Sequence, residues 1–406
     1  MATYTYKFRL LPNANQASRL SKHFGVCRYV YNHFLAQRHQ LYRDNGQGST
    51  YYKDCAALTK LKEELDWIGD ANSQSLQQEL KNLDTAYTRF FKKQARFPKF
   101  HCKYKDKQSF MVPQHITVKD GVIWLPKFRD GIKFKQHRPM DGEIRYVTVS
   151  QNRAGQHYIC ICVERVITKL EPRENTVGID LGLKDLATCS NGKVFKNIRS
   201  YGTLQKRLRR LQQSVSRMVK GSHNYIRVKN LVAKCHQKIA DIRSNHLHHV
   251  SHDIIIKNQV IMLEDLNVKG MMANRRLAKS VADVSLYELV RQIEYKAGWY
   301  RREVVKIDRW YPSSKTCHVC GHIHEGLTLS DREWICPVCK TKHDRDHNAS
   351  MNILAEGTRQ RAITLGTRGL ACGEGVRLPL GSDFQRSTEA AGSLALRQFT
   401  PPMMKR

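Results

Sequence analysis

The sequence has few acidic residues for its size and no long apolar run. Its 406 residues carry 69 Lys and Arg against 36 Asp and Glu, which leaves a formal net charge of +33. No stretch of about 18 apolar residues could span a bilayer, and the N-terminus lacks the apolar core of a signal peptide. These absences argue against a membrane protein and predict a soluble, intracellular one.

The excess of positive charge needs a partner. Self-repulsion on this scale destabilises a compact chain unless a polyanion screens it. Nucleic acid is the natural screen, because its phosphates release counterions when Lys and Arg bind them. An anionic membrane surface would also attract the charge, but without a spanning segment we favour nucleic acid. The hydrophobic fraction of 41% is enough for real cores and argues against a disordered chain.

The twelve cysteines do not form a disulfide framework, since only four occur in tight pairs. These pairs, Cys317-x-x-Cys320 and Cys336-x-x-Cys339, are fifteen residues apart, as in a four-cysteine zinc ribbon over residues 317–339. Four thiolates close the shell of a tetrahedral ion, so we predict one structural Zn²⁺ with no catalytic role. The neighbouring histidines are expected at the surface or facing phosphate: His318, His322, His324 and His343.

Hydrophobic periodicity predicts an α+β protein of several domains. Alternation over residues 3–10 and short strands over 109–166 predict a small β-barrel built from residues 1–12 and 101–170. Helical stripes over 13–100 predict an inserted helical lobe. After a polar linker, strands and helices over 171–316 and 340–357 predict an α/β domain. Residues 358–406 have little periodicity and are expected to form a weakly ordered tail.

Two stretches concentrate positive charge. Residues 92–107 hold seven Lys and Arg with aromatic residues between them, which suits a nucleic-acid groove. Residues 199–243 form a predicted helical hairpin with twelve Lys and Arg and a single acid, Asp241. A basic helix face is also often plain solvated surface, and this alternative stays open. The candidate phosphate contacts on the first arm are Lys206, Arg207, Arg209 and Arg210.

Three acids stand where an RNase H-like nuclease would need them. Asp180 lies inside an apolar run, where an ionised carboxylate costs several kcal/mol unless cations or hydrogen bonds compensate. Glu264 ends a second apolar run, and Asp346 stands at a predicted helix start. Two carboxylates on adjacent strands and one on a helix can converge on two divalent ions about 4 Å apart and cleave a phosphodiester.

Each acid also has an ordinary structural explanation when it is taken alone. Asp180 could face solvent on an edge strand, Glu264 could simply end its strand, and Asp346 could cap its helix. Asp344 is two residues from Asp346, so on a helix it faces elsewhere, and we expect it either to cap the helix or to hold one of the metal-binding acids in place.

In their order and spacing these motifs resemble the TnpB family over about residues 4–357. The segment from Tyr311 to Gly321, the second cysteine pair and the run from Asp344 to Ser350 carry most of the resemblance. Further matches are Gly178 to Gly182, Leu263 to Leu266, Leu10 to Pro12 and Arg28 to Asn32. Ser350 stands where Ala is usual in the family, and a small residue still fits.

The resemblance implies an RNA-guided DNA endonuclease related to type V CRISPR effectors. Such a protein binds a guide RNA from the transposon end and cuts double-stranded target DNA beside a short transposon-associated motif. The family's catalytic triad falls on Asp180, Glu264 and Asp346 in a RuvC-type RNase H-like domain, with two Mg²⁺ ions for which Mn²⁺ can substitute. The β-barrel becomes its wedge domain and the helical lobe its recognition lobe. Base pairing reads most of the target sequence in this scheme.

The protein itself would read only the short motif. Polar groups suited to base edges occur around one helix start, and Lys81 follows on the same helix. These candidates are Tyr51, Asn72, Ser73, Gln74 and Gln77. We expect a monomer on one RNA. Two alternatives use the same residues: a strand-transferring DNA transposase, and an RNA-guided repressor that binds DNA without cleavage.

Overall fold

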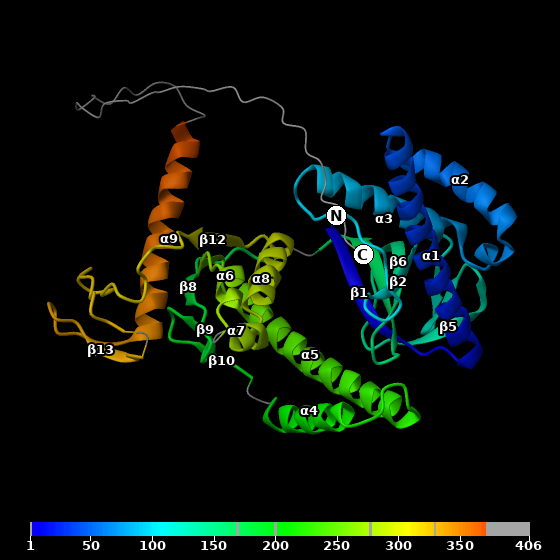
Figure 1. Cartoon of the computed structure of the whole chain (residues 1–406). Coiled ribbons are helices and arrows are strands. Elements are labelled where there is room, and N and C mark those ends of the chain that lie inside the picture. The colour runs from blue at the N-terminus through cyan, green and yellow to red at the C-terminus, as the bar shows by residue number, and fades with distance from the viewer. Residues whose placement is uncertain (1, 168–169, 199–200, 276–277, 329, 371–406) are drawn as a thin grey trace. The chain divides into compact units, whose positions relative to one another are not determined.

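The computed structural model describes residues 2–167, 170–198, 201–275, 278–328 and 330–370 (Figure 1). The chain divides into two compact units, residues 1–359 and 360–406. The first unit contains two main sheets with separate hydrophobic cores. No helix in the described ranges is long and apolar enough to cross a membrane.

The first sheet has seven strands in the order β2-β6-β7-β1-β5-β4-β3. Their bounds are β1 (Ala2–Leu10), β2 (Gln108–Val112), β3 (Thr117–Lys119), β4 (Val122–Leu125), β5 (Phe128–Lys135), β6 (Glu143–Gln151) and β7 (His157–Arg165). Strand β1 pairs with β7 and β5, which confirms that the N-terminal strand joins strands far along the chain. The predicted small β-barrel is present in part: among the described strands β2 and β3 are the two edges of the sheet, so the sheet is a half-barrel.

Helices lie between β1 and β2 in sequence and share the core of this sheet. They are α1 (Ala14–Asn45), α2 (Tyr51–Glu64), the 3₁₀ helix η1 (Asp66–Asp70) and α3 (Ser73–Phe91). Asn13 and Gln16 form a capping box at the start of α1, and Gly46 ends it in the left-handed conformation. The apolar stripes predicted for α1 and α3 are buried in one cluster with side chains of the sheet, such as Phe8 and Phe110. The proposed domain limits within this region stay a prediction.

The second sheet has the order β10-β9-β8-β11-β12. Its strands are β8 (Thr176–Asp180), β9 (Asp185–Cys189), β10 (Val194–Lys196), β11 (Val260–Glu264) and β12 (Glu303–Ile307). Strands β8, β11 and β12 are parallel, while β9 and β10 run antiparallel to their neighbours. One face packs on α5 (His223–Lys257) and α8 (Leu286–Tyr300), and the other packs on α9 (Arg345–Leu370).

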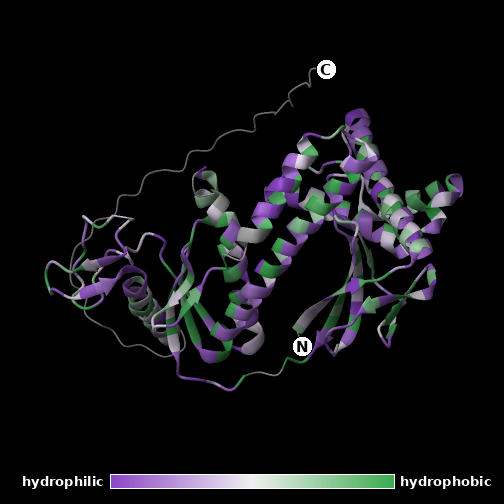
Figure 2. Cartoon of the chain, turned by 90° about the horizontal axis from the view of Figure 1, so that it is seen from below, coloured by the Kyte–Doolittle hydropathy of each residue, from purple (hydrophilic) through white to green (hydrophobic). Residues whose placement is uncertain are grey.

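The predicted basic hairpin is present as α4 (Tyr201–Ser216) and α5. In Figure 2 the helices of the chain carry hydrophilic and hydrophobic residues side by side. Two short helices, α6 (Val268–Ala273) and α7 (Ala278–Val284), connect β11 to α8.

Helix α9 corrects the prediction of a tail from residue 358. The α/β domain was expected to end at residue 357, but its last helix continues to Leu370. Gly357 lies against strand β11: a β-carbon there would be 2.6 Å from the Met262 sulfur. This glycine therefore allows the helix to pack closely on the strand. The rest of the predicted tail, residues 371–406, lies outside the described residues.

Candidate functional site

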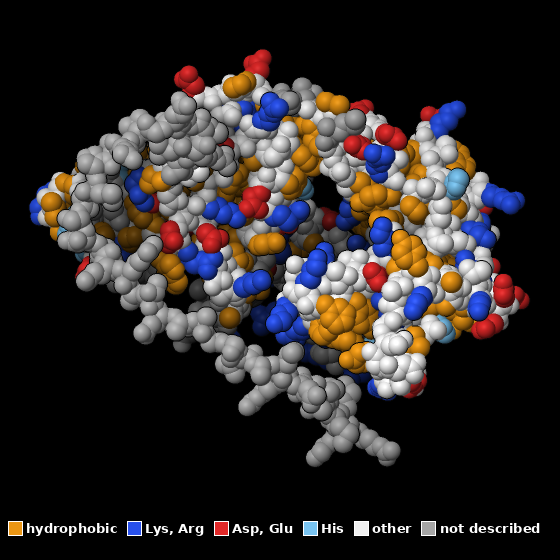
Figure 3. Space-filling model, turned by 90° about the horizontal axis from the view of Figure 1, so that it is seen from above, with side chains coloured by type: hydrophobic (Ala, Val, Ile, Leu, Met, Phe, Trp, Pro, Cys, Tyr) orange, Lys and Arg blue, Asp and Glu red, His pale blue; other side chains and the backbone are white. Residues whose placement is uncertain are grey.

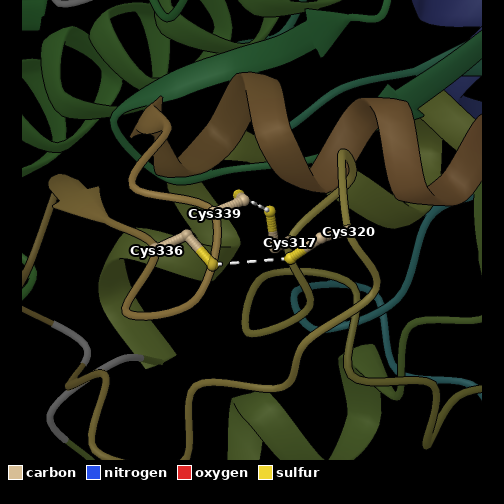
Figure 4. Close-up of side chains that lie close together, drawn as sticks. All are labelled: Cys317, Cys320, Cys336 and Cys339. Atoms are coloured by element: carbon tan, nitrogen blue, oxygen red, sulfur yellow. Dashed lines mark hydrogen bonds between the residues drawn. The ribbon is translucent and has the colours of Figure 1, made fainter.

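The four predicted zinc ligands converge in the structure. Their Sγ atoms all lie within 4.8 Å of one another. Figure 4 shows the side chains pointing toward one another from two loops. The Sγ–Sγ distance is 3.5 Å between Cys317 and Cys339 and 3.6 Å between Cys320 and Cys336. A tetrahedral site with four Zn–S bonds has an edge of about 3.8 Å, so the cluster fits zinc.

The two cysteine pairs have the same local fold. The amide of Gly321 donates to the carbonyl of Cys317, and the amide of Lys340 donates to the carbonyl of Cys336. Gly321 and Lys340 both have positive φ, as tight knuckles require. Hydrogen bonds from Thr341 lower the pKa of the Cys339 thiol to about 6, which favours the thiolate that binds metal.

His343 corrects the prediction of four surface histidines. It is 3% exposed, because β14 (Lys342–Asp344) pairs with β13 (Glu333–Ile335) and turns its middle residue inward. His343 Nε2 lies 3.1 Å from Cys317 Sγ, and the imidazole packs against Trp334 with ring centroids 4.7 Å apart. The imidazole therefore helps to hold a ligand sulfur in place.

The register of the second sheet brings two of the predicted acids together. Strands β8 and β11 are parallel and pair Leu263 with Ile179, so Glu264 follows beside Asp180. Ile179 and Leu263 face the core with α5 and α8. Because side chains alternate along a strand, Asp180 and Glu264 point to the opposite face, where α9 packs.

Helix α9 brings the third acid to this face. A β-carbon on Gly178 would lie 2.2 Å from the Ser350 carbonyl oxygen and 2.5 Å from the Leu354 nitrogen. The helix backbone thus lies directly against β8, and Asp346 is one turn before Ser350. The Asp344 carboxylate accepts the amide hydrogen of His347 at 2.8 Å, so Asp344 caps the helix as expected. Asp346 does not serve as the cap.

Burial and neighbouring negative charge disfavour ionised carboxylates on this face. Burial, followed by the negative charges of Glu264 and Asp346, raises the pKa of Asp180 to about 8. Arg345 and Arg332 oppose this shift. Burial also raises the pKa of Glu264. A divalent cation beside these acids would favour their ionised forms.

Two residues that hold these acids were not predicted. The Ser313 hydroxyl donates to Glu264, and Arg332 Nη1 lies 3.3 Å from both carboxylate oxygens of Asp346. Arg332 lies between the two cysteine pairs, so the cysteine module contacts the acidic site directly. Nothing local in the sequence marks either residue, because both contacts join distant segments.

Asparagines of α9 attach the cysteine module to the second sheet. Asn348 Nδ2 donates to the Thr316 carbonyl at 2.7 Å, and Asn348 Oδ1 accepts from the His318 amide at 3.0 Å. Asn352 Nδ2 donates to the carbonyls of Ser313 and Thr316. Both side chains are buried, so they fix the module relative to the helix that carries Asp346.

The predicted nucleic-acid contacts on the hairpin lie on an accessible surface. All four basic residues of α4 are exposed: Lys206, Arg207, Arg209 and Arg210. On the face shown in Figure 3, Lys and Arg side chains are spread widely, with acidic side chains between them. In the basic segment that follows α3, Phe100 and Tyr104 are 54% and 82% exposed, as stacking on a base requires.

The candidate base-reading residues divide into exposed and buried ones. Gln77, Lys81 and Ser73 are exposed, and Tyr51 is half-buried. Asn72 is wrong as a base contact: it is 8% exposed, and its amide donates to Ser75 Oγ at 3.3 Å because it stands at the start of α3. The half-buried Gln74 donates to Gln114 at 2.8 Å.

Comparison with a solved structure defines the class of fold. The chain matches a chain in the cryo-EM structure of the Cas12f1-sgRNA-target DNA complex with a TM-score of 0.52 and 15% identity. The match covers 83% of this chain and 82% of that chain. The protein therefore has the fold of a Cas12-type effector.

Sequence relatives define the family. The chain is 36% identical over 398 residues to a Streptomyces pristinaespiralis protein named "Putative RNA-guided DNA endonuclease", covering 97% of this chain and 95% of the relative. It is 34% identical to Escherichia coli InsQ, which carries the same name, over 92% and 94% of the two chains. Residues 158–275 match the IS605 OrfB family described as "Probable transposase". The chain belongs to the TnpB family.

Two further family matches bear on the domains. Residues 287–353, which include the cysteine module, match the TNB domain of Cas12f1-like proteins. Residues 1–47 match a family described as a helix-turn-helix domain. In this structure the same residues form strand β1 and the single helix α1 of 32 residues.

Proposed function

We propose that this protein is an RNA-guided DNA endonuclease. It binds a guide RNA derived from the transposon end and hydrolyses target DNA beside a short transposon-associated motif. Two relatives that match nearly the whole chain carry this activity in their names, which supports the proposal. The observation that carries it is the position of Asp180 and Glu264 on adjacent strands, on the face of the second sheet that is covered by α9, the helix of Asp346.

In this proposal the three carboxylates hold two divalent ions in a RuvC-type, RNase H-like site. An all-oxygen donor set suits Mg²⁺, with Mn²⁺ as a substitute. When bound, the ions supply positive charge for the attack of water and the departure of the 3′ oxygen. Ser313 and Arg332 orient Glu264 and Asp346 before DNA arrives. The raised pKa of Asp180 is consistent with a site in which bound cations stabilise the ionised carboxylate.

The remaining parts of the proposal concern assembly. The half-barrel would act as the wedge domain and α1–α3 as the recognition lobe, with Tyr51, Ser73, Gln77 and Lys81 near the motif. The basic hairpin would contact phosphates. One chain would act on one RNA, and the complex would work in the cytoplasm at the nucleoid.

The test begins with the RNA that co-purifies with the protein from its native locus. That RNA is sequenced, and the complex is given Mg²⁺ and a target library with randomised flanks. A defined RNA and cleavage beside one motif are the expected results. A defined RNA without cleavage would favour the guided repressor. Without a defined RNA, joining of transposon ends in a strand-transfer assay would favour the transposase.

A further inference from the structure

A pocket of about 260 Å³ lies where α1 meets the turn between β4 and β5. It is separate from the acidic site and from the cysteine module. Gln16 Nε2 donates to the Gly131 carbonyl at 2.7 Å, and Arg19 donates to the Lys127 carbonyl, so helix and turn are firmly joined here. The lining residues are Arg19, Lys22, His23, Asp70, Lys127 and Phe128.

The pocket is lined by three cationic side chains, those of Arg19, Lys22 and Lys127, and by one acid, Asp70. Arg19 has one ion pair, to Asp130 at 3.4 Å, and both side chains are largely exposed. Within the described ranges, neither Lys22 nor Lys127 has a carboxylate within ion-pair distance. Lys127 is close enough to contribute to the lowered pKa of His23, after burial. Such a group of cations attracts a phosphate.

Lys127 has a backbone conformation that costs free energy. Leu125 pairs with Phe128, so Pro126 and Lys127 form a two-residue turn. Lys127 has a φ of +71°, at the turn position where glycine is normally found. A non-glycine residue there costs roughly 1 kcal/mol. Glycine at this position would therefore relieve the strain of the turn, which makes Lys127→Gly a substitution that removes the charge without a cost in stability.

The pocket also has rings and an uncharged imidazole. His23 is 3% exposed and stacks on Phe110 with centroids 3.9 Å apart. Burial lowers the pKa of His23 to about 4, so the imidazole is neutral at pH 7. Its Nε2 has no hydrogen-bond partner in the part of the chain that the structure describes. Phe128 lies nearby, with the Arg19 guanidinium 5.1 Å from its ring centroid. Phe128 is 2% exposed and belongs to the core of the first sheet, so the two rings form the bottom of the pocket and leave its charged groups as the accessible ones.

We interpret Asp70 as the residue that lets the pocket distinguish RNA from DNA. Its carboxylate is exposed among cations, at the end of η1. A carboxylate repels phosphate but accepts a hydrogen bond from a sugar hydroxyl, and the 2′-hydroxyl distinguishes RNA from DNA. We infer that this pocket binds one ribonucleotide of the guide RNA, with its phosphate on Lys22 and Lys127 and its 2′-hydroxyl on Asp70. The inference rests on the proposed function.

The test uses the full-length protein freed of nucleic acid and the RNA that co-purifies with wild type. Affinity is measured by fluorescence anisotropy and stability by thermal unfolding. Lys127→Gly should weaken RNA binding about tenfold, since it removes a charge-assisted hydrogen bond to phosphate. It should leave Tm unchanged or raise it, because the strained turn relaxes. Lys133→Ala is the matched control: it removes an exposed lysine of β5 that does not line the pocket.

Asp70→Ala tests the sugar contact. We expect this variant to lose part of the preference of wild type for the RNA over a DNA of the same sequence. An unchanged preference would overturn the ribonucleotide assignment. Lys127→Gly binding RNA as tightly as Lys133→Ala would overturn the pocket, while the proposed function would stand. If wild type bound no defined RNA, the proposed function would fail and the pocket inference with it.

Discussion

A β-carbon on Gly178 would lie 2.2 Å from the carbonyl oxygen of Ser350, so α9 and β8 are in backbone contact at this position. The contact sets the distance between the sheet and the helix. Asp180 is two residues beyond Gly178, and Asp346 is one turn before Ser350. Gly178, which has no side chain, therefore sets how closely the strand of Asp180 and the helix of Asp346 approach each other.

Gly178→Ala should damage both stability and cleavage. The added methyl group clashes with backbone atoms that cannot rotate away, and over-packing of this kind costs about 1–3 kcal/mol or more. Separation of α9 from β8 should also move Asp346 away from Asp180. We expect a lower Tm in thermal unfolding and a loss of cleavage larger than the folded fraction explains.

Gly25→Ala is the matched control for that substitution. Gly25 lies within α1, and its added β-carbon would meet no atom within 4 Å. Alanine in a helix interior is favoured over glycine by up to about 1 kcal/mol, so Tm should rise slightly. Equal losses in the two variants would contradict the role given to the close approach of Gly178 and Ser350.

Glu79 should make stability depend on pH. It is 8% exposed on α3, and burial raises its pKa from 4.5 to about 7. Between these values the folded state holds a proton that the unfolded state has released. Stability is therefore highest below the unfolded pKa and falls as pH rises toward 7, by up to about 3 kcal/mol.

Glu79→Gln should remove this pH dependence and raise the free energy of unfolding at pH 8. Urea unfolding at pH 5 and pH 8 measures the difference. Glu63→Gln, which changes an exposed acid on α2, should keep the wild-type profile. If the free energy of unfolding fell by the same amount in Glu79→Gln and in wild type between pH 5 and pH 8, the claim that Glu79 is buried in its neutral form would be contradicted.

Removal of zinc should lower cleavage although the ion is not part of the acidic site. Metal analysis should find one zinc per chain in wild type and none in Cys336→Ser, while Cys102→Ser retains it. Because Arg332 lies inside the cysteine module and pairs with Asp346, collapse of the module frees that carboxylate. Cleavage should therefore fall strongly in Cys336→Ser. Full cleavage by a zinc-free protein would contradict this link.

The basic hairpin should contribute salt-dependent affinity. Replacement of Arg209 and Arg210 by Ala should lower the slope of log K against log salt by about one for each phosphate that the variant no longer binds. Arg291→Ala is a suitable control, since Arg291 is already paired with Glu288 at 2.7 Å. An unchanged slope in the double variant would mean that this face of the hairpin is solvated surface that does not bind phosphate.

Local patterns were enough to predict some parts of the structure. The zinc ligands are two short motifs, so their spacing alone identified them. The strand that ends in Asp180 was evident as an apolar run. The capping role of Asp344 was also correct, because a cap depends on the neighbouring helix start.

Long-range contacts could not be predicted in this way. The pairing of Arg332 with Asp346 depends on how the cysteine module folds back on α9. The close packing of Gly357 on Met262 joins a helix to a strand almost one hundred residues away, so no local pattern marks it. His343 was expected at the surface because a strand of three residues is too short to show alternation.

The most direct test of the central claim is Mg²⁺-dependent cleavage of a guided target by wild type, Asp180→Asn and the control Asp241→Asn, with stability measured in parallel. Asp241 is exposed on α5, so its variant should cut like wild type. Asp180→Asn should bind RNA, lose cleavage and unfold at a higher temperature in chelator, because a buried carboxylate facing two others is gone. If Asp180→Asn cleaved DNA at the wild-type rate, the three acids would not be the catalytic site.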